Sequence, residues 1–149
     1  MNRHVERLGA LLAGVWLGVL VAIAAIATPA MFALLEPGMA GRTAGRVLAV
    51  EAYVSLGMCV VLFGIERGRA RHDVVEGRGS VLTANLLLVL GALFCTVAGY
   101  FAVVPMMDAA RAGQGRQSFG ALHGISSGFY LLKTILVLCL AWRTAGTRR

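Results

Sequence analysis

The sequence predicts an all-α integral membrane protein, a four-transmembrane-helix bundle with both termini in the cytoplasm. Of its 149 residues, 58% are hydrophobic and only 14% are charged, whereas soluble domains average about 45–50% apolar and about 25% charged residues. The mean hydropathy is +0.79. Long apolar runs alternate with short arginine-bearing segments. This composition excludes intrinsic disorder, which needs low hydrophobicity, and it excludes a soluble enzyme with a polar surface.

Four apolar runs define a single domain over residues 1–149, at 8–35, 47–65, 81–104 and 122–142. A helix needs about 20 residues to cross a hydrocarbon core ~30 Å thick, so each run suffices. Barrel strands have about 9–11 residues of alternating polarity, and these runs show no alternation. The first run exceeds the ~7–15 apolar residues of a signal peptide. We therefore expect it to be an uncleaved first span.

The arginines predict the orientation. Nine lie before the first run, between the second and third, or after the fourth, and four lie in the other two segments. The positive-inside rule then places both termini inside a bacterial cytoplasmic membrane, and segments 36–46 and 105–120 outside. The net charge of +7 also suits nucleic acid. Because the arginines fall between apolar runs, however, the expected partner is the lipid bilayer and not nucleic acid.

Small residues at four-residue spacing predict where helices touch. Gly14 and Gly18 form a G-x-x-x-G step in the first run, and Gly91 and Gly99 repeat the device around Cys95 in the third. Such stripes allow close helix approach in lipid. We expect contact faces inside the bundle, with a homo-oligomer interface as the alternative.

Two prolines mark the outer ends of the first and third runs. Pro29 is expected to bend the first span, and Pro105 to close the third.

Two charged residues inside the apolar runs are the first functional candidates, because charges in a bilayer are costly. Glu51 lies about two turns into the second run, and Lys133 lies near the middle of the fourth. Helical side chains lean toward their N-terminus, so Lys133 leans toward the depth of Glu51 and a pair is feasible. It is either an ion pair that fixes the register of the bundle or part of a proton or cation relay.

A polar stripe follows one side of the fourth run. It consists of His123, Ser126, Ser127, Tyr130 and Thr134, which helical periodicity places in one sector. Facing lipid would strand the hydroxyls, so the stripe faces protein or water. Interhelical hydrogen bonds and the lining of a small outward cavity are both consistent with it.

Soft-metal ligands gather near the expected outer face. His123, Met106 and Met107 are weak candidates for a metal such as Cu(I), although methionine is also a common filler of apolar runs. The three cysteines lie at different depths and predict no thiolate cluster. Nucleotide-binding, nucleophile-elbow and zinc-protease motifs are missing from the sequence. We expect no enzyme activity and no cofactor.

The order of several short motifs resembles the transmembrane protein 205-like family, known among bacterial proteins as domain of unknown function 4149. The motifs are Trp16-Leu-Gly18, Thr28-Pro29-Ala-Met-Phe32, Ala40-Gly41 with Gly45, Tyr53, Pro105 and Leu122-His123-x-x-Ser126. Family members often carry Asn one turn beyond the Ser, where this chain has Tyr130. The resemblance implies a multi-pass membrane protein without an established reaction. A eukaryotic relative is connected with tolerance of platinum drugs, which implies handling of soft metals. A second resemblance is to copper-resistance-D-like membrane domains.

Two functions follow as expectations. The first is a small structural or accessory membrane protein whose polar stripe holds helices together. The alternative is a small transporter or soft-metal handling protein with an outward-facing polar cavity. Glu51, His123, Ser126, Ser127 and Tyr130 would line that cavity, with Lys133 as the counter-ion. The ligand is unknown in either case.

Overall fold

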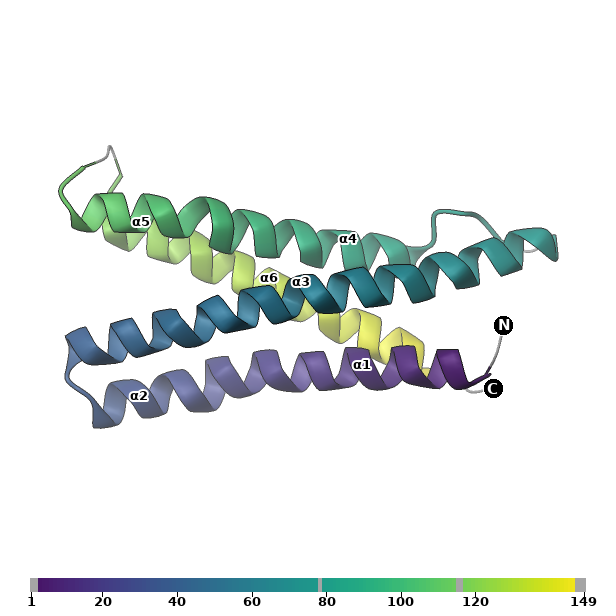
Figure 1. The fold of residues 1–149 in the computed structure, drawn as a ribbon, viewed down its shortest axis with the longest axis horizontal. Helices are drawn as coiled ribbons and strands as arrows, with labels where there is room; N and C mark the ends of the chain where they lie inside the picture. The colour runs from purple at the N-terminus through teal and green to yellow at the C-terminus, as the bar shows by residue number, and fades with distance from the viewer. Residues whose placement is uncertain (1–2, 78, 115–116, 147–149) are drawn as a thin grey trace.

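Four long helices make up the protein in a computed structural model, which describes residues 3–77, 79–114 and 117–146. Within these ranges the helices long and apolar enough to cross a membrane are Arg3–Leu34, Pro37–Val75, Ala84–Arg111 and Phe119–Gly146. They lie lengthwise beside one another, and the first begins at the end of the molecule where the fourth finishes (Figure 1). The described residues contain no strand. They have the length and composition of a multi-pass membrane protein.

The second and fourth spans are continuous helices, whereas the first and third each contain a π-helical segment. The continuous helices are α3 (Pro37–Val75) and α6 (Phe119–Gly146). The first span consists of α1 (Arg3–Ala22), η1 (Ile23–Ala27) and α2 (Thr28–Leu34). The third consists of α4 (Ala84–Thr96), η2 (Val97–Ala102) and α5 (Val103–Arg111).

The helix α3 is longer at both ends than the apolar run 47–65 that predicted it. It begins at Pro37, so most of the expected outer loop is helical, because proline suits the first turn of a helix. It continues to Val75 through residues rich in Arg, Glu and Ala, which are good helix formers. Gly77 follows in a left-handed conformation, φ 73°, which is a common way to end a helix. Hydropathy marks where a chain leaves lipid, and the helix outlasts that point.

The prediction that Pro105 closes the third span was wrong, since the helix continues to Arg111. A π-helical turn precedes each span proline. Val103 donates its N–H to the carbonyl of Ala98, and Thr28 donates to that of Ile23, five residues back in both cases. The wider turn shifts the hydrogen-bond register just before a residue that has no N–H to donate. The chain passes both prolines without ending the helix.

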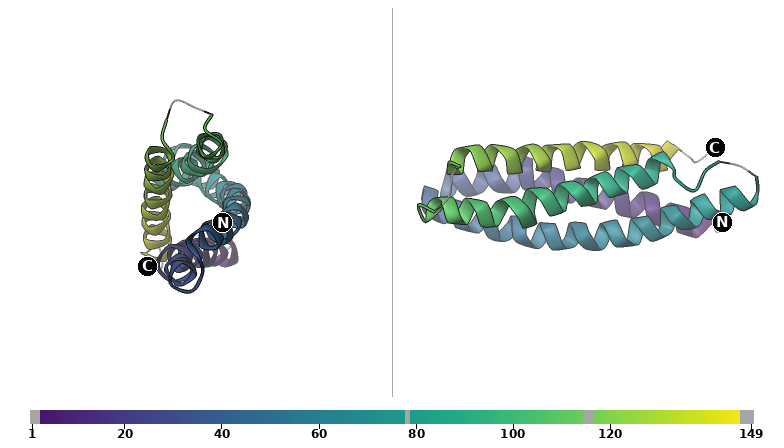
Figure 2. Two further views of the ribbon diagram at one scale, coloured as in Figure 1. Left: turned by 90° about the vertical axis from the view of Figure 1, so that its left-hand side faces the viewer. Right: turned by 90° about the horizontal axis from the view of Figure 1, so that it is seen from above.

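One apolar core joins the four spans through their inner halves. Its members are Ala13, Trp16, Leu20, Cys59, Leu62, Val89, Ala92, Val137 and Leu140. Toward the other end the helices separate into two pairs, α2 with α3 and α5 with α6. The two pairs diverge in Figures 1 and 2. A smaller cluster of Val103, Met107 and Leu122 fills the second pair.

The predicted glycine contacts occur in the third span but not in the first. A Cβ on Gly99 would lie 2.7 Å from Cβ of Phe129, and one on Gly91 would lie 3.0 Å from Leu136, so the third span packs tightly on α6. A Cβ on Gly14 or Gly18 would meet no atom within 4 Å. The buried face of α1 consists instead of Gly9, Ala13, Trp16 and Leu20. The Gly14–Gly18 step is therefore not a contact within the chain.

Candidate functional site: a buried ion-pair network

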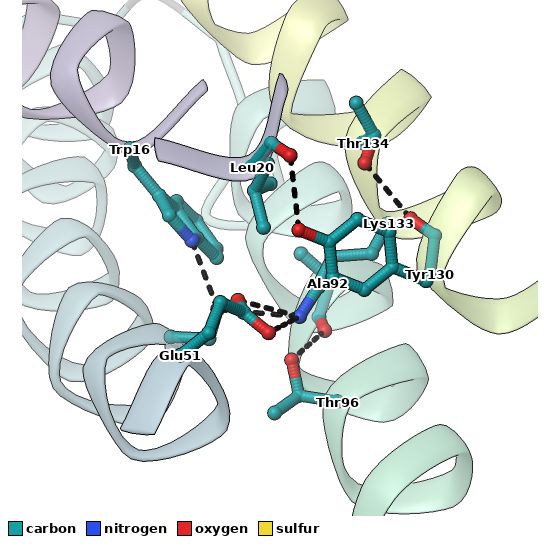
Figure 3. A network of polar contacts seen from close by, with 9 residues as sticks. Trp16, Leu20, Glu51, Ala92, Thr96, Tyr130, Lys133 and Thr134 are labelled. Carbon is teal, nitrogen blue, oxygen red and sulfur yellow. Dashed lines mark hydrogen bonds and ion pairs between the residues drawn. The ribbon is translucent and has the colours of Figure 1, made fainter. Parts of the chain in front are cut away.

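A buried ion pair joins the middle of α6 to α3. The ammonium of Lys133 lies 2.8 Å from Oε1 and 2.9 Å from Oε2 of Glu51. The two residues are 3% and 4% exposed, respectively. Figure 3 shows both charged groups pointing toward each other between the helices. At this depth each charge needs the other, because an unpaired ion costs several kcal/mol to bury.

Two further side chains complete the pair and bring α1 into the network. Ser55 lies one turn after Glu51 on the same face of α3 and donates its hydroxyl hydrogen to Oε1 of that carboxylate. It accepts hydrogen bonds from Lys133 Nζ at 3.4 Å and from the indole N–H of Trp16 at 2.9 Å. The Trp16 side chain is fully buried. Sequence reasoning did not assign Ser55 a role, although its four-residue spacing from Glu51 was a usable signal.

Tyr130 shields the ammonium from the α6 side. Its ring centroid is 4.9 Å from Lys133 Nζ, within the range of a cation–π contact. Its hydroxyl donates to the carbonyl of Leu20 in α1 at 3.0 Å, a contact visible in Figure 3. Tyr130 therefore has one polar bond and one electrostatic contact, to two different partners.

The remaining members of the predicted stripe have separate environments. Ser126 donates to the carbonyl of Gly99, inside the π-helical segment η2, at 2.9 Å. Thr134 donates to the carbonyl of Tyr130 in its own helix at 2.9 Å. His123 and Ser127 are exposed, and His123 stacks on Phe119 with ring centroids 5.8 Å apart. The structure thus gathers Glu51, Lys133 and Tyr130 and leaves His123 and Ser127 apart from them.

The weak metal candidates also separate. Met106 is 47% exposed, whereas Met107 is buried against Val103 and Leu122. Among the residues that the structure describes, no three His, Cys, Asp or Glu side chains are grouped as a metal site would require.

A second buried polar network, which sequence reasoning missed, lies at the other end of the core. Glu66 of α3 is 3% exposed. Its Oε1 accepts from Arg69 at 3.1 Å, and its Oε2 accepts from Nδ2 of Asn85 at 3.0 Å. The Oδ1 of Asn85 accepts from Nε of Arg143 at 2.8 Å. The network joins α3, α4 and α6, and its signal in the sequence was a Glu and an Asn at the facing ends of two apolar runs.

An apolar layer separates the two networks. It contains Cys59, Leu62, Val89, Val137 and Leu140. Both networks are saturated: within the described ranges, no buried side-chain nitrogen or oxygen lacks a hydrogen-bond partner. Because buried polar groups cost free energy only when they are unpaired, this arrangement is compatible with a stable resting structure.

Comparison with known proteins gives one match. Residues 11–116 match the family described as Domain of unknown function (DUF4149). No curated protein and no solved structure matches the chain. The match supports the bacterial-family part of the resemblance, while the wider transmembrane protein 205-like and copper-resistance-D-like resemblances stay predictions.

Proposed function

The chain belongs to the DUF4149 family, and from the geometry of its buried networks we propose that it is a small structural or accessory protein of a bacterial cytoplasmic membrane. It is not an enzyme in this proposal, and the Glu51–Lys133 pair fixes how its spans pack. One observation carries the proposal. Every polar atom of the pair is bonded within the protein, to Ser55, Trp16 and the opposite charge.

The energetics of buried ion pairs explain how such a pair specifies structure. Its net contribution to stability is small, because desolvation offsets attraction, but removing one partner typically costs about 3–5 kcal/mol. A shift of α6 by one residue would rotate Lys133 by about 100° and leave both charges unpaired. The pair therefore penalises every packing except the observed one.

Thermal unfolding of purified variants in detergent tests this role. Glu51→Gln and Lys133→Met each remove one charge, and we expect a loss of about 3–5 kcal/mol from each. The double variant Glu51→Leu/Lys133→Met removes both charges and should regain most of that loss. Glu36→Gln changes an exposed carboxyl at the start of α3 and is the matched control.

Complementation of a gene deletion then separates a structural role from a chemical one. If the pair only holds the spans, the double variant works as well as the wild type once it folds. A double variant that is stable yet fails to complement would contradict the proposal and favour a relay through Glu51 and Lys133.

The orientation with both termini in the cytoplasm belongs to this proposal. Its support is the arginine content of the end where α1 begins and α6 ends, which carries Arg3, Arg7, Arg67, Arg69, Arg71 and Arg143. The opposite end carries Arg42, Arg46 and Arg111. Arg78, Arg116, Arg148 and Arg149 also entered the sequence argument and lie outside the described residues. The excess of basic residues favours that end as the cytoplasmic one.

The second candidate is a transporter or soft-metal handling protein, and one observation favours it. His123 and Ser127 are exposed on α6, on the half of the molecule where the two helix pairs diverge (Figure 1). A thermal-unfolding scan with Cu(I), Ag(I) and Zn(II) tests this candidate. A metal at 100 times its Kd stabilises by about 2.7 kcal/mol. Stabilisation that disappears in His123→Ala supports a metal site, whereas no response from any of these metals argues against one.

A further inference from the structure

The second buried network ends in an arginine with unused donors. We propose that Arg143, held in place by Asn85 and Glu66, binds the phosphate group of an anionic membrane lipid. This inference rests on the membrane location given under Proposed function, but it does not rest on the role of the Glu51–Lys133 pair.

The hydrogen bonds fix the orientation of each group in turn. A carboxylate accepts but does not donate, so Glu66 takes the NH₂ group of Asn85 and leaves the amide oxygen for Arg143. That oxygen holds Nε of the guanidinium at 2.8 Å. Within the described residues, neither terminal nitrogen of Arg143 has a hydrogen-bond or ion-pair partner. Because a guanidinium is planar and rigid, fixing Nε also fixes where the two free NH₂ groups point.

The charge of the network favours an anion. It contains two guanidinium groups, from Arg69 and Arg143, and one carboxylate, from Glu66. Glu66 uses its two oxygens on Arg69 and Asn85, so the charge of Arg143 is not neutralised inside the network. A phosphate offers the acceptor geometry that matches a planar guanidinium fork.

The depth of Arg143 matches that of a lipid headgroup. Lys133 lies near the midpoint of α6 (Phe119–Gly146). Ten residues separate it from Arg143, about 15 Å of helix, which is half of a ~30 Å hydrocarbon core. The neighbouring Trp142 is 79% exposed, and exposed Trp is typical of the interface between headgroups and lipid tails. An exposed arginine at this level meets lipid phosphates, which favours a lipid over a soluble phosphate.

Trp142 also provides the readout, because it adjoins the proposed site. We would place the protein in nanodiscs of phosphatidylcholine that contain a small fraction of brominated phosphatidylglycerol or, in parallel, of brominated phosphatidylcholine. The brominated lipids quench nearby tryptophan, and Trp142→Phe shows how much of the signal belongs to this position. We expect about fivefold enrichment of the anionic lipid at Trp142, the factor that corresponds to ~1 kcal/mol for one basic side chain at the surface.

Variants separate a specific site from general attraction to basic residues. Arg143→Gln should abolish the preference, Asn85→Ala should weaken it, and Arg143→Lys should retain only part of it, because Lys has the charge without the fork. The matched control Arg71→Gln removes an exposed arginine from the same end and should preserve the preference.

Three results would overturn the inference. The wild type could show equal quenching by both brominated lipids. Arg143→Gln and Arg71→Gln could lower the preference equally, which would mean diffuse attraction. Glycerol phosphate in solution could displace the lipid at millimolar concentration, which would mean a site for free phosphate. Thermal unfolding of each variant separates loss of the site from loss of the fold, and none of these outcomes depends on the stability of the Glu51–Lys133 pair.

Discussion

Gly99 shows how little space the third span leaves at its contact with α6. A Cβ there would lie 2.7 Å from Cβ of Phe129, and Cβ positions cannot move without the backbone. We predict that Gly99→Ala destabilises the protein by about 1–3 kcal/mol, the usual cost of overpacking. Thermal unfolding in detergent measures the change. Gly14→Ala is the control, since its Cβ would meet no atom within 4 Å, and equal losses in the two variants would contradict this account.

Trp16 contributes to the ion-pair network through one N–H. We predict that Trp16→Phe, which keeps an aromatic ring but removes the donor to Ser55, costs about 1–3 kcal/mol from the lost bond and the smaller ring. Trp142→Phe changes a 79% exposed ring and should have no measurable effect. The measurement is the shift in unfolding midpoint of the two variants under identical conditions. A stable Trp16→Phe protein would show that the indole N–H is dispensable.

The π-helical segments are the feature of single elements that matters most. Each precedes a proline, and in each broken span a carbonyl in or near the segment accepts a hydroxyl from α6: Gly99 from Ser126, and Leu20 from Tyr130. Widened turns disturb the normal hydrogen-bond ladder, and side-chain donors then satisfy the carbonyls. The two polar residues of α6 thus act on the irregular parts of their neighbours.

This arrangement predicts a local effect at η2 (Val97–Ala102). Ser126→Ala removes the hydroxyl bond to Gly99 and should cost only about 0.6 kcal/mol globally, as is typical of such bonds in membrane proteins. Amide hydrogen exchange should nevertheless increase within η2, because local opening responds to local bonds. Ser127→Ala, one residue away and exposed, should leave exchange there unchanged. An increase of the same size in both variants would contradict the assignment.

Sequence reasoning predicted the four spans because hydropathy reports burial in lipid directly. It misjudged the length of α3 and the effect of Pro105, because helix ends depend on local hydrogen bonds that hydropathy does not measure. It placed Glu51 and Lys133 at compatible depths but left their pairing open. It misplaced Gly14 and Gly18 because the rotation of α1 about its axis is set by Trp16 packing toward Ser55. That contact lies between residues 39 positions apart, so no periodicity within one helix reveals it.

The molecule as a whole is longer than the membrane it is expected to cross. The 39 residues of α3 span about 58 Å at 1.5 Å per residue, whereas a bilayer with its headgroups is about 40–45 Å thick. The surplus turns lie toward Val75, beyond Glu66, where the residues are charged and exposed. In the proposed orientation this end of α3 projects into the cytoplasm.

Reporter fusions test that orientation. A fluorescent protein that matures only in the cytoplasm should be bright when it is fused after Gly146, and dark when it is inserted after Gly113, a left-handed residue at the end of α5. Alkaline phosphatase, which is active only outside, should give the reverse pattern. The opposite result in both assays would invert the topology, although the packing of the helices would be unaffected.

The π-helical turns make the outer half of the molecule sensitive to residue number as well as to residue identity. Deleting one residue from Ile23–Ala27 would let the chain close into an ordinary α-helix, and everything beyond it would turn by about 100° about the helix axis. The face that α2 presents to α3 would then point elsewhere, although no side chain in that contact had changed. A three-nucleotide deletion in the gene is therefore expected to be more damaging at these two stretches than most substitutions there.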